Sequence, residues 1–322
     1  MRFGSHHTVA ILAGALAASL AGSAVAGPAT QASPAQASPM PAPAAQAPAA
    51  QAPAAQAPAA PFLQAAYVKG SAGPLLDPNA AYWKDAKPAS VPMLPQIMTK
   101  PQNPNPAVKE LSVRAAHNGQ WLAFLIEWSD PTKSDRLVVD QFGDQVAVEM
   151  PSNFKPDAYP NPLMGGPDDR VHIMQWRAAF QRDIEEGHEP RIADLYPNVH
   201  VDVYPDEVLR ATDASAYTGA VGVDNPISRP KHSAVLDQMA EGFGTLTVEP
   251  EQQSDGRGVW SDGKWRVVIT HPLAPGDPND PTLAPGSDTL AAFAVWEGGA
   301  REVGARKAWS NWVPLKLDPL AP

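Results

Sequence analysis

Short apolar stretches separated by turn-forming residues follow the proline-rich beginning of the chain, and they predict strands rather than long helices. Residues 109–115 (KELSVRA) alternate between apolar and polar side chains, as a strand with one exposed face does. Residues 121–128 (WLAFLIEW) are almost continuously apolar, which indicates a strand buried on both faces. The dipeptide Asn118-Gly119 between them suits a type I′ turn, so the two segments are expected to form a β-hairpin.

The same reading extends along the chain. Further strands are expected at residues 145–150 (QVAVEM), 242–248 and 264–271 (KWRVVITH), and residues 171–180 (VHIMQWRAAF) are expected to form a strand that runs into a helix. The stretch with Gly256, Gly258 and Gly263 is expected to be rich in turns. Many short strands and few helical patterns predict an all-β fold, an antiparallel β-sandwich with a few short helices.

Residues 294–317 pair the end of a strand with a glycine turn and a single lysine. Gly298 and Gly299 are expected to supply the positive φ that a tight connection needs. From Lys307 to Leu317, alternation predicts one strand with a mostly apolar face that includes Lys307. A lysine buried in such a face has a lowered pKa and can offer a neutral amine to a metal. The alternative is that Lys307 lies at a strand end and reaches solvent.

The N-terminal part of the chain differs from the rest in composition. Residues 1–26 have an apolar stretch that ends in Ala24-Val25-Ala26, which predicts a secretory signal peptide and a periplasmic location, with no membrane span after cleavage. Residues 27–61 consist mainly of Ala, Pro, Gln and Ser, and we expect a disordered tether. Residues 62–322 are expected to form the folded domain.

Composition excludes several kinds of site. The 322 residues carry a net charge of -10, which argues against nucleic acid as a partner. The chain has no cysteine, so it cannot hold an iron–sulfur cluster, a cysteine zinc site or a covalently attached haem. Any metal or haem must be held by His, Met, Lys, Tyr or carboxylate side chains.

Six segments, taken in order, resemble the haem-binding gamma subunits of ethylbenzene dehydrogenase, dimethyl sulfide dehydrogenase, selenate reductase and chlorate reductase. They are residues 121–131, 142–151, 164–176, 242–250, 263–273 and 294–317. The resemblance implies a β-sandwich that holds one non-covalent haem b between an axial methionine and an axial lysine. By position these haem-iron ligands are Met164 and Lys307, and both lie close to glycines, where a backbone can approach a flat macrocycle.

The resemblance also implies a non-catalytic electron-transfer role. The family's partners are a molybdopterin catalytic subunit and an iron–sulfur subunit, with a soluble cytochrome or another redox carrier exchanging electrons. Two protein ligands fill both axial positions and leave none for oxygen or substrate. Lysine binds iron only without its proton, so ligation is expected to weaken as the pH falls. The secretory signal departs from the family pattern, because family members that travel inside a prefolded complex need no signal of their own. A free-standing haem protein and a subunit of a different respiratory assembly are therefore alternatives.

Other ligands and another function fit the sequence as well. Met98, Met150 and Met174 are alternative sulfur ligands, and His172 and His271 offer imidazole. The alternative function is a carbohydrate-binding-like β-sandwich module without haem, in which some of the nine tryptophans stack on sugars. A hydrolase has no support, because the chain has neither a G-x-S-x-G nor an H-E-x-x-H motif.

Overall fold

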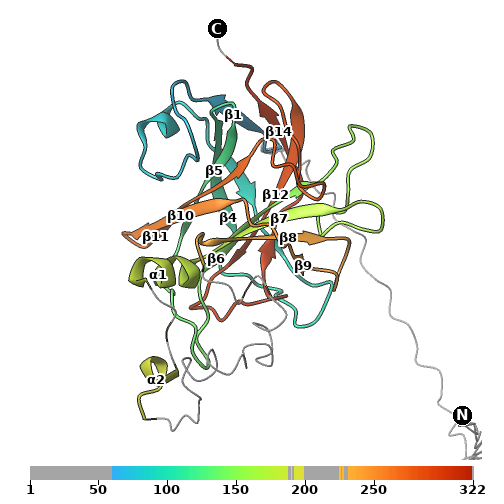
Figure 1. The fold of residues 1–322 in the computed structure, drawn as a ribbon. Helices are drawn as coiled ribbons and strands as arrows, with labels where there is room; N and C mark the ends of the chain where they lie inside the picture. The colour runs from blue at the N-terminus through green and yellow to red at the C-terminus, as the bar shows by residue number, and fades with distance from the viewer. Residues whose placement is uncertain are drawn as a thin grey trace, which may run out of the picture. The chain divides into compact units, whose positions relative to one another are not determined.

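The computed structural model describes residues 60–187, 190, 192–198, 225, 227 and 231–320 (Figure 1). The expected signal peptide of residues 1–26 lies outside these ranges, and so does the expected tether except for its last two residues. Among the described residues, no helix is both long and apolar enough to cross a lipid bilayer.

Short strands make up most of the described chain. In order, the elements are β1 (Leu63–Tyr67), the 3₁₀ helix η1 (Ala81–Lys84), β2 (Ala89–Pro92), β3 (Leu94–Pro95), β4 (Glu110–His117), β5 (Trp121–Ser129), β6 (Gln145–Pro151), β7 (Val171–Arg177), α1 (Ala178–Glu186), α2 (Ile192–Leu195), β8 (Val235–Ala240), β9 (Thr247–Val248), β10 (Asp255–Ser261), β11 (Lys264–Pro272), β12 (Asp288–Trp296), β13 (Ala308–Trp309) and β14 (Val313–Leu317).

The strands form two layers that share β12. The first half of β12 pairs with β14 in the sheet β10-β11-β5-β4-β1-β14, and its second half pairs with β6 in the sheet β6-β7-β8-β9. Nearly all pairings are antiparallel, but β1 runs parallel to both β14 and β4. The expected antiparallel β-sandwich is therefore confirmed, with β1 as the exception.

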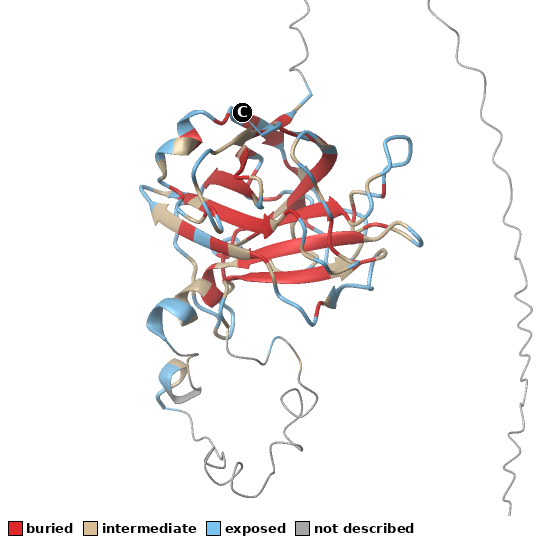
Figure 2. Ribbon diagram, turned by 45° about the horizontal axis from the view of Figure 1, so that its top comes forward, coloured by how far each residue is buried: buried red, intermediate tan, exposed pale blue. Residues whose placement is uncertain are grey.

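The main core lies between the two sheets. Phe124 of β5 and Phe293 of β12 meet there edge to face, with ring centroids 6.1 Å apart. The near-continuous burial expected for β5 is confirmed, because η1 and its flanking segments place Trp83 and Leu75 over the outer side of this sheet, against Leu125. Figure 2 shows the buried residues concentrated in the strands of both layers.

Alternation along β6 and β7 separates two faces of the second sheet. Val148 of β6 and Met174 of β7 point into the main core, whereas Ala147 and Ile173 belong to a smaller apolar cluster outside it. The strand-to-helix reading of residues 171–180 is confirmed, since β7 leads directly into α1. The second sheet therefore has an inner face that completes the core and an outer face that is free to build a site.

The expectation of turns before β11 holds for Gly263, which lies with positive φ in the turn between β10 and β11, but it was wrong for Gly256 and Gly258. Gly256 and Gly258 lie inside β10, where a side chain would not fit. A Cβ on Gly258 would lie 2.5 Å from the ring of Trp176, and one on Gly256 would lie 2.6 Å from Val235. These glycines serve close packing of a strand on its neighbours. The expected strand at residues 242–248 is reduced to β9.

The connection after β12 also differs from expectation. Gly298 and Gly299 do not have positive φ, whereas Arg301 and Gly304 do. Gly298 is required for space instead, because a Cβ there would collide with the carbonyl group of Phe142. The single strand expected from Lys307 to Leu317 is broken into β13 and β14.

Side-chain hydrogen bonds stabilise two further connections, one between β13 and β14 and one between β4 and β5. Between β13 and β14, Ser310 turns inward, and its Oγ accepts a 2.9 Å hydrogen bond from the N–H of Phe293. At the hairpin between β4 and β5, Gly119 has positive φ but Asn118 does not, so the type I′ geometry was wrong. The side-chain oxygen of Asn118 closes this turn by accepting from the N–H of Trp121 at 2.8 Å. The hairpin itself is confirmed.

Candidate functional site

The outer face of the second sheet forms the floor of a cavity of about 520 Å³. Its walls come from the loops around residues 96–100, 164, 243–246 and 303–307. The side chain of Gln96 ties two of these loops together, since its Nε2 donates to the carbonyl oxygens of Thr99 and Ala305 at 2.9 Å each. A cavity of this size is in the range of those that bind cofactors and other small molecules.

Lys307 lines this cavity, at the end of the connection that follows β12. Its Nζ lies 5.9 Å from the ring centroid of Trp296, within the range of a cation–π contact. Burial lowers the pKa of Lys307, and the negative charge of Glu149 opposes this change. Because the side chain is partly buried, its environment favours the neutral amine more than water does.

Met164 lines the same cavity from the opposite stretch of chain. It lies in the turn after Asn161, and its carbonyl oxygen accepts a 2.7 Å hydrogen bond from the N–H of Gly242. Its φ of 69° is in the left-handed region, which methionine rarely adopts and which costs on the order of 1–3 kcal/mol. The next residue, Gly165, also has positive φ, and a Cβ there would lie 2.5 Å from the carbonyl oxygen of Asp169. The turn thus holds Met164 in one strained conformation.

Glu149 is a buried carboxyl group beneath these two residues, and the sequence reading missed it. Burial raises the pKa of Glu149 to about 8, while the charge of Lys307 and the N–H of Met164 act in the other direction. Its Oε1 has no hydrogen-bond partner. Alternation along β6 assigns Glu149 to the outer face with Ala147, but no residue pattern indicates that this face is covered.

The polar part of the floor is a chain of amide side chains that ends at an arginine. Gln175 accepts hydrogen bonds from Arg177 at 2.9 Å and from Gln238 at 3.0 Å, and it donates to Gln145 at 2.7 Å. Burial lowers the pKa of Arg177, and its Nε has no hydrogen-bond partner. A partly buried guanidinium group with a free donor suits an anionic group in the cavity.

The alternative ligands lie elsewhere. Met150 and Met174 are 0% exposed in the main core, on the inner side of the second sheet. Met98 is 65% exposed. His172 and His271 are buried next to each other, with ring centroids 4.8 Å apart, and neither lines the cavity. Of the candidate ligands, the structure brings only Met164 and Lys307 together at this cavity among the residues it describes.

Sequence comparison finds relatives over most of the chain. A protein of Haloferax mediterranei, provisionally named as respiratory nitrate reductase haem subunit ORF7, is 24% identical over 244 residues, which cover 75% of this chain and 68% of the relative. The chlorate reductase gamma subunit of Ideonella dechloratans is 24% identical over 250 residues, which cover 77% of this chain and 82% of the relative.

Structure comparison gives a weaker likeness. A family 9 carbohydrate-binding module from Caldicellulosiruptor kristjanssonii, solved with cellotriose, matches 81% of this chain and 95% of its own. The TM-score is 0.39 at 10% identity, so the match carries no argument about function.

The family model described as ethylbenzene dehydrogenase matches residues 80–308, which include the outer face of the second sheet, the Met164 turn and Lys307. This match spans more than half of the chain, and it agrees with the resemblance expected from the sequence. The chain therefore belongs to the ethylbenzene dehydrogenase family.

Proposed function

We propose that this chain is a periplasmic electron-transfer subunit that holds one non-covalent haem b, with Met164 and Lys307 as the two axial ligands. It is not itself a catalyst. One observation carries the proposal: Met164 and Lys307, far apart in the sequence, line the same cavity on the outer face of the second sheet. The two relatives add support, since one is named as a haem subunit and the other as the gamma subunit of chlorate reductase.

The residues around the cavity fit this group. The thioether of Met164 and the amine of Lys307 are the donors, and burial favours the neutral form of the lysine. Ile173 and Trp296 add apolar surface to the lining, against which a flat macrocycle can pack. Arg177 and Lys100 add positive charge to the lining, where they can pair with the carboxylate groups of a porphyrin.

The chemistry is electron transfer. When bound, a haem supplies a one-electron redox centre whose potential is set by its ligands and by burial. Met164 and Lys307 would hold the iron from the protein side, and with both positions filled no substrate would bind to it. We propose a molybdopterin catalytic subunit and an iron–sulfur subunit as partners, with a soluble cytochrome or similar carrier as the exchange partner. These partners rest on the family and on the names of the relatives.

The test is the visible absorption spectrum of the full chain, exported by its own signal in a haem-supplied bacterial periplasm. We expect a low-spin b-type spectrum in the wild type. Lys307→Ala and Met164→Ala should each lose this spectrum or convert it to a high-spin one, because each removes one axial ligand. Met98→Ala and Lys316→Ala, which change exposed residues of the same types, should keep the wild-type spectrum.

Far-ultraviolet circular dichroism of each variant separates loss of a ligand from loss of the fold. A folded wild-type chain that stays colourless after reconstitution with haem would overturn the proposal. A haem spectrum that survives both ligand variants unchanged would refute the ligand assignment while leaving haem binding in place.

A further inference from the structure

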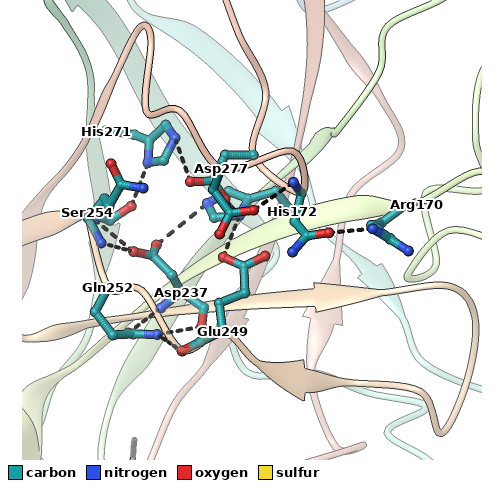
Figure 3. Close-up of polar contacts among 11 residues, drawn as sticks. Arg170, His172, Asp237, Glu249, Gln252, Ser254, His271 and Asp277 are labelled. Carbon is teal, nitrogen blue, oxygen red and sulfur yellow. Dashed lines mark hydrogen bonds and ion pairs between the residues drawn. The ribbon is translucent and has the colours of Figure 1, made fainter.

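A second group of ionisable side chains lies between the two sheets, away from the cavity. His172 comes from β7, Asp237 from β8, His271 from β11 and Glu249 from the loop that follows β9 (Figure 3). Asp280 comes from the loop that follows β11. All five are at most 4% exposed. Side chains alternate along β7, so Ile173 points to the outer face of the second sheet and His172 points inward, toward Asp237.

Several polar atoms of this group have no hydrogen-bond partner. They are both ring nitrogens of His172, Nε2 of His271, Oδ1 of Asp237, Oδ1 of Asp280 and both oxygens of Glu249. A buried polar atom without a partner destabilises the fold, because it has given up its hydrogen bonds to water. Some of these atoms face one another across ion-pair distances, as Nδ1 of His172 faces Asp280 at 2.8 Å, whereas Nε2 of His271 and Oδ1 of Asp237 are left for a ligand.

Hydrogen bonds from neighbouring residues hold His271 and Asp237 so that one polar atom of each has no hydrogen-bond partner. Ser254 Oγ lies 2.9 Å from Nδ1 of His271, which leaves Nε2 of that ring free. Oδ2 of Asp237 accepts from the backbone N–H groups of Gln253 and Ser254 at 2.7 Å each, which leaves Oδ1 free. Such outer contacts are typical of residues that bind a metal, because they set the orientation of the ligand and the tautomer of the histidine.

Distances within the group suit a single ion. One ligand atom each from His172, Asp237 and His271 lie within 4.8 Å of one another, and Nε2 of His172 is 3.5 Å from Oδ1 of Asp237. Ligands about 2.0–2.2 Å from one tetrahedral ion have this mutual spacing after a small adjustment. On the other side of the His172 ring, Nδ1 lies 2.8 Å from Asp280 and 3.3 Å from Glu249.

A second buried group of carboxylates differs from the one around His172. Asp130, Asp144 and Glu297 also lie close together, but their carboxylates accept hydrogen bonds from the backbone N–H groups of Thr132, Gly298 and Gly299 respectively. Both oxygens of Asp144, for example, accept from N–H groups, one from Gly298 at 2.8 Å and the other from Trp265 Nε1 at 2.9 Å. That group is satisfied by the protein, so it carries no proposal, whereas the one around His172 is not.

We propose that His172, His271 and Asp237 bind a divalent transition-metal ion between the two sheets, with Asp280 and Glu249 contacting the other ring nitrogen of His172. Two imidazoles and a carboxylate suit zinc and similar ions, whereas Ca²⁺ and Mg²⁺ prefer oxygen ligands alone. The positive charge of the ion offsets the three buried carboxylates. Because the ligands come from both layers, the ion joins the sheets and has a structural role that is separate from the proposed haem.

The experiment uses the full chain, purified without an affinity tag, and measures metal content by mass spectrometry. After treatment with EDTA and addition of Zn²⁺, we expect about one zinc ion per wild-type chain and a higher midpoint of thermal unfolding. His271→Gln and Asp237→Asn should retain less than about a tenth of that zinc, because each removes one of three ligands. His232→Gln, which changes an exposed histidine, should bind like the wild type.

Wild-type protein alone decides the outcome if the variants do not fold. A folded wild-type chain that retains no metal after Zn²⁺, Co²⁺ and Mn²⁺ are offered, and whose unfolding midpoint none of them shifts, would overturn the proposal. Retention of zinc at the wild-type level by folded His271→Gln would also refute it, since the ion would then lie elsewhere. Stabilisation by Ca²⁺ alone would show that the choice of metal is wrong.

Discussion

A substitution at Gly258 would test how tightly the sandwich packs beneath the candidate site. The backbone of β10 at Gly258 lies against two buried indole rings, Trp176 and Trp265, which meet edge to face at 5.0 Å. In Gly258→Ala, the added methyl carbon would lie 2.5 Å from one atom of the Trp176 ring and 3.1 Å from the Trp265 ring. The first separation is far inside van der Waals contact, so a ring or the strand must move.

Hydrogen bonds restrict that movement. Trp176 Nε1 donates to Oε1 of Gln181 at 3.0 Å, and the same Gln181 binds the backbone of Gly258 through both its oxygen and its nitrogen, at 2.6 Å and 2.8 Å. The ring and the strand are therefore joined to one side chain, and neither moves away without breaking a contact. Overpacking of a well-packed core costs about 1–3 kcal/mol, and this position belongs at the upper end of that range.

The assay is urea denaturation followed by tryptophan fluorescence, with a thermal scan in parallel. We expect Gly258→Ala to lower the free energy of unfolding by about 2–3 kcal/mol and the thermal midpoint by roughly 4–12 °C. Gly166→Ala is the control, because its Cβ would have no atom within 4 Å and its φ is ordinary. If Gly258→Ala unfolds within about 0.5 kcal/mol of the wild type, the rigidity inferred for this packing is wrong.

Two other predictions concern pH and the methionine turn. Burial raises the pKa of Asp144 to about 7 in the folded chain. As the pH rises, the unfolded chain therefore loses this proton before the folded chain does. The free energy of unfolding should fall by up to about 4 kcal/mol between about pH 4 and 7 and then level off. Urea denaturation across this range should show a smaller slope in Asp144→Asn, and equal slopes would contradict the assignment. Gly165→Ala should lower the free energy of unfolding by more than about 1 kcal/mol, because the new Cβ would strain the turn that holds Met164. The same strain should weaken any haem spectrum. A stability and spectrum like those of Gly166→Ala would contradict this.

The alternation of apolar residues predicted most of the strands, because side-chain period is a local property. Residues 121–128 and 264–271 form strands within a residue or two of the expected bounds, and they pair with each other. The glycines of β10 misled the reading, since their role depends on Trp176, which lies far away in the sequence. The break between β13 and β14 depends on Ser310, whose contact with Phe293 no local pattern indicates.

The residues of the candidate site also differ in how far the sequence alone indicates them. Met164 was identified only through the family resemblance. Alternation of apolar residues had already indicated Lys307 as a possible metal ligand, and the resemblance then made it the expected haem ligand. Glu149 looked like one more polar position in an alternating strand, although it lies beneath both of them. His172 and His271 were considered only as haem ligands, because nothing in their spacing shows that loops carrying Glu249 and Asp280 cover them.

The position of β1 has a consequence for the order of folding. This strand, near the start of the folded domain, is held between β4 and β14, and β14 is the last strand of the described chain. A hydrogen bond from Gln64 to Asp318 joins residues 254 positions apart. The first sheet therefore cannot close until nearly the whole chain has been made, and contacts over such long distances in sequence slow folding. A chain that stops before β14 leaves β1 without one of its partners, so a nascent chain stays open until its synthesis is almost complete.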